Sequence, residues 1–230
     1  MAKKETILAI DSSTLDTILR QTGPNIRPCC SLTKQQSYEL MNALDEHIWF
    51  GPREALESDY EFRQIIPYVI VSNGSRILIY QRSSSKGDNR LNNLWSIGLG
   101  GHVKLQDTNP LMLLRTPFIS VTNLLFNSMK RELSEELMMP FQNIDEKQIT
   151  PIGYIITGNK YTKDVNAVHF GIVFYYENPN IILPYHNDDD MKHFQFINKH
   201  DAIEDFNNDG NTLEDWSIAA TEILGGLING

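Results

Sequence analysis

A short segment rich in glutamate constrains this chain more than any other part of it. Residues 131–139 read Arg-Glu-Leu-Ser-Glu-Glu-Leu-Met-Met, a composition that favours a helix. At 3.6 residues per turn, Glu132, Glu135 and Glu136 lie on one face of that helix. An apolar stripe occupies the other face, formed by side chains spaced by four: Leu125, Met129, Leu133 and Leu137. The segment predicts an amphipathic helix that packs on a core and presents clustered negative charge.

Two interpretations of the acidic face follow from the residues alone. The first is a solvated surface, which is what most acidic helix faces are. The second is a metal site. Each adjacent pair of like charges costs roughly a few tenths of a kcal/mol on an isolated helix, and no lysine is interleaved among the three glutamates. A hard cation such as Mg²⁺ or Mn²⁺ removes this repulsion, because it takes carboxylate oxygens and keeps positions open for water and phosphate.

A glycine pair upstream favours the metal site. Gly100 and Gly101 lie in a predicted strand over residues 95–103, where the backbone must pass close to another group. Together with the glutamates, these glycines resemble the two halves of the Nudix box, G-x5-E-x7-R-E-U-x-E-E-x-G-U with U aliphatic. Nudix proteins are pyrophosphate hydrolases. Further stretches resemble a bacterial subgroup of MutT-like predicted phosphoesterases: residues 63–68, 90–91, 96–98, 168–171 and 214–217.

The match departs from the box in three places. Asp107 stands where the box has its first glutamate, and this carboxylate is shorter. Residues 108–130 separate Asp107 from Arg131, which makes 23 residues where the box has seven and implies an insertion, placed at about 108–124. The insertion is too apolar for a free linker, so we expect it to pack as a flap or interface, or to lengthen the start of the helix. Met138 replaces the last glycine, so the helix should end without the usual glycine cap.

The resemblance implies roles for particular residues. Glu132, Glu135 and Glu136 would ligate Mg²⁺ or Mn²⁺ together with the backbone carbonyl of Gly100, and Arg131 would orient the glutamates. The catalytic set is Glu135, Arg131 and Glu132, with Glu135 as first choice for general base and His169 or a loop carboxylate as substitutes. The expected substrate-binding residues are Arg82, Arg90, Gly101, His102 and His169.

The residues leave some of these roles open. Arg82 and Arg90 either bind substrate phosphate with bidentate hydrogen bonds or form surface ion pairs. His169 is either a structural strand residue or a ligand or acid–base group that faces the pocket. Cys29 and Cys30 are adjacent, which suits neither an ordinary disulfide nor a zinc site, so we expect them to be reduced. A role as nucleophile, or as the cysteine of a Nudix-fold isomerase, is weakened by their distance in sequence from the glycine pair.

Composition restricts the partners. The net charge is −9, which disfavours a nucleic-acid polymer or an anionic membrane as partner. No apolar run approaches the ~18 residues that a bilayer span requires, and the first residues lack the apolar segment of an export signal, which predicts a cytoplasmic protein. The apolar insertion slightly favours a homodimer over a monomer, with residues 108–124 or the N-terminal extension contributing buried contact. The extension otherwise shapes the substrate pocket.

The predicted fold is a single Nudix-type α/β/α sandwich with a mixed sheet, in the α/β (α+β) class. We expect an N-terminal accessory extension over residues 1–60, which includes a loop over residues 50–53, and a Nudix domain over residues 61–230 that closes with a helix over residues 213–224 capped by Thr212. Strands at 65–71 and 76–82 are joined by an Asn73-Gly74 turn, and a further strand covers 168–176.

The predicted function is metal-dependent hydrolysis of a phosphoanhydride in a nucleoside diphosphate linked to another moiety. The alternative is a Nudix-fold sensor that binds a nucleotide or a protein and has weak catalytic activity or none. Three departures from the box favour this alternative: Asp107, Met138 and the insertion that splits the box. The intact glutamates speak against it.

Overall fold

A strand buried on both faces, β4 (Phe62–Ser72), organises the sheet. Its side chains alternate between two cores, so that Ile65 and Val69 face one of them while Tyr68 and Ile70 face the other. A strand that is buried on both faces has a nearly continuous apolar sequence. The strand over residues 65–71 was predicted from this pattern.

The computed structural model describes residues 5–22, 26–83, 91–108, 119–158, 165–182, 191–204 and 212–229. The other strands are β1 (Thr6–Asp11), β2 (Cys29–Ser31), β3 (Ile48–Pro52), β5 (Arg76–Arg82), β6 (Trp95–Ser96), β7 (Gly98–Gly100), β8 (Ile149–Ile155), β9 (His169–Glu177) and β10 (Met191–Asn198). The helices are α1 (Ser12–Thr22), α2 (Lys34–Leu44), α3 (Arg53–Leu56), α5 (Val121–Glu136), α6 (Lys199–Glu204) and α7 (Asp215–Asn229).

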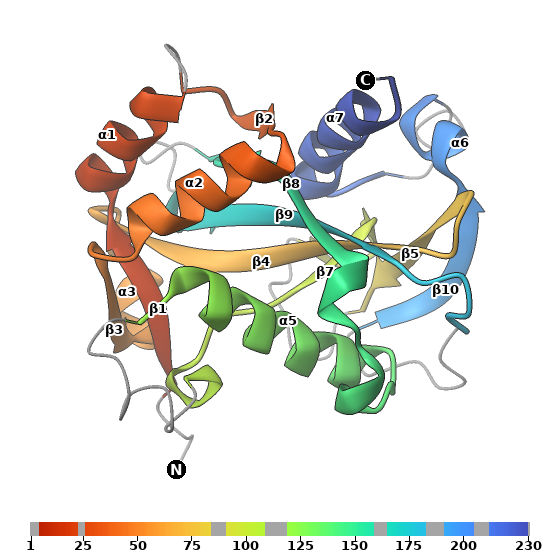
Figure 1. Ribbon diagram of the computed structural model, residues 1–230, viewed down its shortest axis with the longest axis horizontal. Coiled ribbons are helices and arrows are strands. Elements are labelled where there is room, and N and C mark those ends of the chain that lie inside the picture. The colour runs from red at the N-terminus through yellow and green to blue at the C-terminus, as the bar shows by residue number, and fades with distance from the viewer. Residues whose placement is uncertain are drawn as a thin grey trace.

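The strands form one mixed sheet in the order β10-β5-β4-β9-β8-β2. Only the central pair, β4 and β9, is parallel among the strand pairs of the described ranges. Helices α1, α2 and α5 pack on one face of the sheet, and α6 and α7 pack on the other (Figure 1). These three layers confirm the predicted α/β/α sandwich with a mixed sheet.

The predicted hairpin between β4 and β5 is confirmed. Gly74 has a φ of +105°, a conformation that glycine adopts without a steric penalty. The Asn73 amide donates a hydrogen bond to the Arg76 carbonyl oxygen at 3.1 Å, which closes the turn.

The prediction of one continuous strand over residues 95–103 is wrong. The segment forms two short strands: β6 pairs with β5, and β7 pairs with β4. At the break the Ser96 hydroxyl oxygen lies 3.0 Å from the Gly98 carbonyl oxygen, and a Cβ at Gly98 would collide with the Tyr68 ring. The bend therefore carries the chain from one neighbour in the sheet to another, and it brings the glycine segment beside β4.

The N-terminal segment is hydrogen-bonded into the same sheet. β1 pairs with β3 on one side and with β4 on the other. The prediction of a loop over residues 50–53 is wrong, because Phe50, Gly51 and Pro52 complete β3 opposite β1 and Arg53 begins α3. Cys29 and Cys30 are free thiols in β2. The domain boundary at residue 60 stays a prediction.

Helix α5 begins at Val121, so the end of the insertion does lengthen the start of the box helix, while residues 109–118 lie outside the described residues. All four residues of its predicted apolar stripe are buried. The last helix, α7, begins later than predicted and is not capped by Thr212. Residues 212–214 are instead hydrogen-bonded to Trp95, through Trp95 N to Thr212 O at 2.8 Å and Glu214 N to Trp95 O at 3.0 Å. None of the described helices is long and apolar enough to cross a bilayer.

Candidate active site

The arginine of the glutamate helix holds the two separated halves of the predicted box together. Arg131 Nε donates to Asp107 Oδ1 at 2.8 Å, and Nη2 donates to Asp107 Oδ2 at 2.9 Å. Nη2 also reaches the His102 carbonyl oxygen at 3.1 Å. Arg131 and Asp107 are both largely buried, so this bidentate pair is shielded from solvent. The insertion between them in sequence does not separate them in space.

The shorter side chain of Asp107 reaches Arg131 because a turn of the backbone brings it close to α5. It ends a single 3₁₀ turn over Leu105–Asp107, and its Oδ2 accepts a hydrogen bond from the Lys104 amide at 2.8 Å. The Asp107 carbonyl oxygen accepts a second one from Asn127 Nδ2 of α5 at 2.9 Å. The turn therefore brings the shorter carboxylate up to the helix.

Glu132 lies against the glycine segment. A Cβ at Gly101 would collide with the Glu132 carboxylate, so only glycine allows this approach. Arg131 Nη1 donates to Glu132 Oε1 at 2.5 Å. Burial raises the pKa of Glu132 above its usual value, and the charge and hydrogen bond of Arg131 lower it only in part. A further cation beside this carboxylate would favour its charged form.

The other two glutamates are placed differently. Glu135 has a side chain that is 61% exposed and lies 3.6 Å from Arg131 Nη1 through its Oε2. Glu136 is half-buried, and its charge is among those that raise the pKa of Arg82, which places it within electrostatic reach of that residue. Within the described ranges, no three His, Cys, Asp or Glu side chains are gathered closely enough to hold a metal ion.

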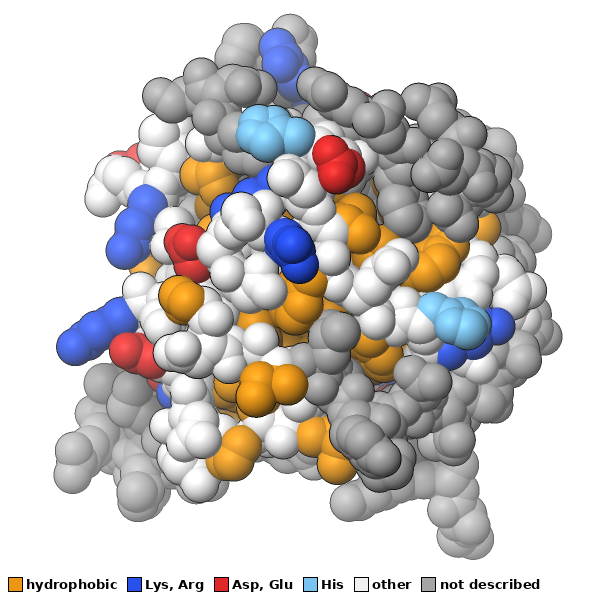
Figure 2. All heavy atoms as spheres, turned by 90° about the vertical axis from the view of Figure 1, so that its right-hand side faces the viewer, with side chains coloured by type: hydrophobic (Ala, Val, Ile, Leu, Met, Phe, Trp, Pro, Cys, Tyr) orange, Lys and Arg blue, Asp and Glu red, His pale blue; other side chains and the backbone are white. Residues whose placement is uncertain are grey.

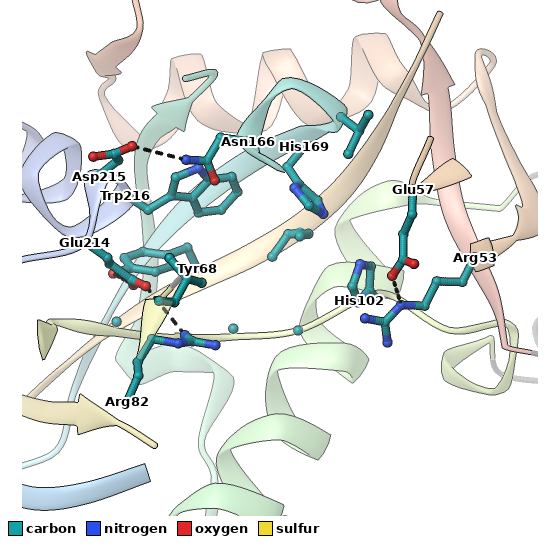
Figure 3. Close-up of a pocket in the computed structure, with 16 residues that line it drawn as sticks. Arg53, Glu57, Tyr68, Arg82, His102, Asn166, His169, Glu214, Asp215 and Trp216 are labelled. Atoms are coloured by element: carbon teal, nitrogen blue, oxygen red, sulfur yellow. Dashed lines mark hydrogen bonds and ion pairs between the residues drawn. The ribbon is translucent and has the colours of Figure 1, made fainter. Parts of the chain in front are cut away.

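A cavity of about 670 Å³ opens beside the glycine segment (Figure 3). Five of the residues predicted for the site line it: Arg82, Gly100, Gly101, His102 and His169. Arg90 lies outside the described residues. The glutamates of α5 are not among the lining residues, and Glu132 adjoins the cavity through its contact with Gly101.

One end of the cavity holds an acidic side chain in a buried hydrogen-bond network. Glu214 Oε1 accepts a hydrogen bond from the Ser96 hydroxyl at 2.6 Å, and its Oε2 lies 3.6 Å from Arg82 Nη1. Tyr68 joins the network through a 2.9 Å hydrogen bond with Ser217. Burial alone lowers the pKa of Arg82, but its electrostatic interactions with Tyr80 and Glu214 raise it above the usual value. Arg82 therefore stays charged.

Two histidines lie further along the cavity, with ring centroids 5.8 Å apart. His102 Nε2 is 2.7 Å from the Gln64 side-chain oxygen. Burial, followed by the charge of Arg53, lowers the pKa of His102 to about 3. His102 is thus neutral at physiological pH. His169 also contacts the Trp216 ring edge to face, with centroids 6.3 Å apart, and it faces the cavity as one of the two open interpretations requires.

Several lining residues had no predicted role. Glu214 and Trp216 lie in one of the stretches that carry the family resemblance, so the sequence contained a signal for them. Tyr68 looked like a core residue of β4. Arg53 and Glu57 lie in the N-terminal segment, where Arg53 was predicted to end a loop and Glu57 follows it.

Comparison with solved structures identifies the fold. Tm1382, whose structure is described as that of a proposed Nudix hydrolase, superposes with a TM-score of 0.68 over 97% of this chain and 99% of that one, at 21% sequence identity. The chain has the Nudix fold. A Nudix hydrolase from Alicyclobacillus acidocaldarius superposes with a TM-score of 0.51 over 70% of this chain and 90% of that one, at 12% identity.

Sequence comparison reaches less of the chain. Protein YmaB of Bacillus subtilis (strain 168) is 34% identical over 118 residues, which are 51% of this chain and 50% of that protein. The match thus spans about half the length of this curated relative. No known family profile matches the chain.

Proposed function

We propose that this protein is a Mg²⁺- or Mn²⁺-dependent pyrophosphohydrolase that cleaves the phosphoanhydride of a nucleoside diphosphate linked to another moiety. One observation carries the proposal: Arg131, Asp107, Glu132 and Gly101 of the split box are in contact on the Nudix fold beside a cavity. The volume of this cavity falls within the ~300–1,000 Å³ typical of small-molecule sites.

The donor set fits a hard divalent cation. Glu132, Glu135 and Glu136 offer carboxylate oxygens, and Gly100 offers a backbone carbonyl, which are the ligands that Mg²⁺ and Mn²⁺ prefer. Burial disfavours the charged form of Glu132, and a cation bound beside this carboxylate would stabilise that form. When bound, the ion would neutralise charge on the phosphate oxygens and acidify the attacking water.

The remaining residues have supporting roles. Arg131 orients Glu132 and limits the freedom of Glu135. Glu135 is our first choice for general base, since it is the most exposed of the three glutamates and so the most accessible to water. His169 and the cavity carboxylate Glu214 are the substitutes. Gly101, His102 and Arg82 line the space for the substrate.

Three features of the sequence favoured the sensor alternative: Asp107, Met138 and the split box. The contacts of Asp107 and the backbone of Met138 weaken the first two arguments. Asp107 makes the contact with Arg131 despite its shorter side chain. Met138 adopts a left-handed conformation with φ of +52°, so α5 ends where a glycine would end it. The split box alone does not favour a protein without catalysis, because its halves meet.

The test is a hydrolysis screen with Mg²⁺ and with Mn²⁺. The compounds are nucleotide sugars, dinucleoside polyphosphates, NADH and oxidised nucleoside triphosphates. On the best substrate, Glu135→Gln should lower kcat on the order of a hundredfold, because it removes a charge from the proposed metal-binding and catalytic set.

Glu39→Gln is the matched control, since Glu39 is an exposed glutamate of α2 bonded only to Gln35 within the described ranges. Its turnover should equal that of the wild type. Equal turnover in Glu135→Gln would refute the role of Glu135. If no compound is cleaved while a nucleotide still raises the melting temperature, the protein is a sensor. A cytoplasmic location stays a prediction from the sequence.

A further inference from the structure

The N-terminal segment contributes an arginine to the cavity. Arg53 is the first residue of α3, which directly follows β3, and β3 is tied through β1 to the central strand β4. Arg53 and Glu57 line the same cavity as Gly100, Gly101 and His102. The N-terminal segment, predicted to shape either the substrate pocket or a dimer contact, therefore forms part of the cavity wall.

The Arg53 guanidinium is held on one side and open on another. Nη1 donates to Glu5 Oε2 at 2.8 Å, and Nε donates to Glu57 Oε1 at 2.7 Å. The second terminal nitrogen, Nη2, makes no hydrogen bond within the described ranges. The side chain remains 41% exposed. Two carboxylates thus fix the orientation of the fork, and one of its nitrogens remains able to donate to a ligand.

The position of Arg53 complements that of Arg82. Figure 3 shows Arg82 beside Glu214 at one end of the cavity and Arg53 beside His102 at the other, with the glycine segment running between them. Arg82 pairs with Glu214 through Nη1 at 3.6 Å. An anionic group that lies along the glycine segment therefore has a guanidinium at each end of the cavity, and at the Arg53 end Nη2 makes no hydrogen bond within the described ranges. A planar fork of this kind suits phosphate oxygens.

We propose that Arg53 is a specificity-determining residue that binds a phosphoryl group of the substrate, so that the N-terminal segment selects a nucleoside diphosphate. This inference rests on the proposed function, which supplies the diphosphate. The competing explanation is that Arg53 has only a structural role. It forms an ion pair with Glu5, and Glu5 also pairs with Lys104 Nζ at 3.1 Å. These ion pairs connect the N-terminal segment with the loop after β7.

Two variants separate the explanations. Arg53→Met keeps the apolar stem but removes the donors, and Glu5→Gln breaks the same ion pair from the side that does not line the cavity. Both should lower the melting temperature to a similar extent. Only Arg53→Met should weaken binding of α,β-methylene-ADP, a non-hydrolysable nucleoside diphosphate, measured by calorimetry with Mg²⁺. We expect a loss of about tenfold, as for a charge-assisted hydrogen bond, against a change within about twofold for Glu5→Gln.

Kinetics provide the second measurement. With the substrate found in the hydrolysis screen, Arg53→Met should raise KM more than it lowers kcat. If Arg53→Met does not fold, Arg53→Lys replaces it, because it keeps a cation for Glu5 but loses the fork, and it should show a smaller loss in the same direction.

Equal affinity in Arg53→Met and the wild type, or an equal loss in Glu5→Gln, would overturn the inference and leave the proposed function standing. A wild-type protein that neither binds the analogue nor cleaves any diphosphate would overturn the proposed function, and this inference with it.

Discussion

At the scale of single residues, Met138 is the clearest departure from what its side chain favours. Its φ is +52°, in the left-handed region, directly after the C-cap of α5 at Leu137. A residue with a Cβ pays roughly 1–2 kcal/mol for this conformation. Met138 is 64% exposed, so burial contributes little to offset that cost.

Met138→Gly should therefore stabilise the protein. Glycine relieves the left-handed strain but costs about 0.5–1 kcal/mol in the entropy of the unfolded chain, which leaves a net gain of about 0.5–1 kcal/mol. Denaturant unfolding measures the free energy of unfolding directly.

The control is Met138→Ala, which removes the same side chain but keeps a Cβ at a left-handed φ. It should bring no gain. If Met138→Ala stabilises the protein as much as Met138→Gly does, the exposed side chain and not the backbone is the source of the cost.

The sequence predicted which residues belong to the candidate site, but it did not predict how those residues contact one another. The glutamate cluster was predicted from its helical spacing, and the roles of Arg131 and the glycine pair were predicted from the resemblance to the Nudix box. Whether Asp107 could reach Arg131 depended on the 3₁₀ turn over Leu105–Asp107, and that turn is held by hydrogen bonds to Lys104 and to Asn127 of α5. Such long-range contacts leave no local pattern in the sequence.

At the scale of elements, the close approach of the glycine segment to α5 shapes the site. Gly101 follows β7 and lies against Glu132, and the atoms that a Cβ would meet belong to the end of a flexible side chain. The carboxylate can move away at little cost in stability, but it then leaves its position beside Arg131.

Gly101→Ala should therefore lower kcat while changing the melting temperature little. A loss of turnover on the order of tenfold is expected for a displaced ligand or positioning group. Gly98→Ala is the contrasting variant, because its Cβ would meet the ring of Tyr68, which is buried and hydrogen-bonded to Ser217. That variant should lower the melting temperature clearly. Unchanged turnover in Gly101→Ala would show that the position of Glu132 does not matter.

Strands with a clear apolar pattern were predicted, whereas elements shaped by distant partners were not. The strand predicted over residues 168–176 is confirmed as β9, in which Phe170, Ile172 and Phe174 belong to one core and Gly171 contacts Trp216 on the other face. The break between β6 and β7 depends on pairing with two different strands. The late start of α7 depends on Trp95, which lies more than a hundred residues earlier in the chain.

At the scale of the whole molecule, the surface charge suits a small ligand. Figure 2 shows the face on the right-hand side of Figure 1, where α6 and β10 lie, and its described lysine and arginine side chains lie scattered among acidic, polar and apolar ones. A binding surface for a nucleic-acid polymer needs clustered cations, and the chain carries 20 Lys and Arg against 29 Asp and Glu. The proposed anionic substrate would instead be held locally, by the proposed metal ion and by single arginines such as Arg53.

The insertion connects the site with assembly. Its apolar stretches lie at residues 111–114 and 118–121. The C-terminal end is covered within the chain: Val121 is fully buried, and its amide donates to Asp45 Oδ1 at 2.7 Å. Residues 109–118 lie outside the described residues. Large exposed apolar patches are rare on monomers, so the apolar sequence of the insertion predicts that it is covered.

We predict a homodimer whose interface includes residues 110–118. Replacing them with a Gly/Ser segment of equal length leaves α5 intact, since that helix begins at Val121. Light scattering should then give the mass of a monomer, while the wild type gives that of a dimer. The same replacement of residues 84–88, a polar stretch, should leave the dimer unchanged. A dimer that persists with full activity after replacement of residues 110–118 would exclude the insertion from both the interface and the cavity.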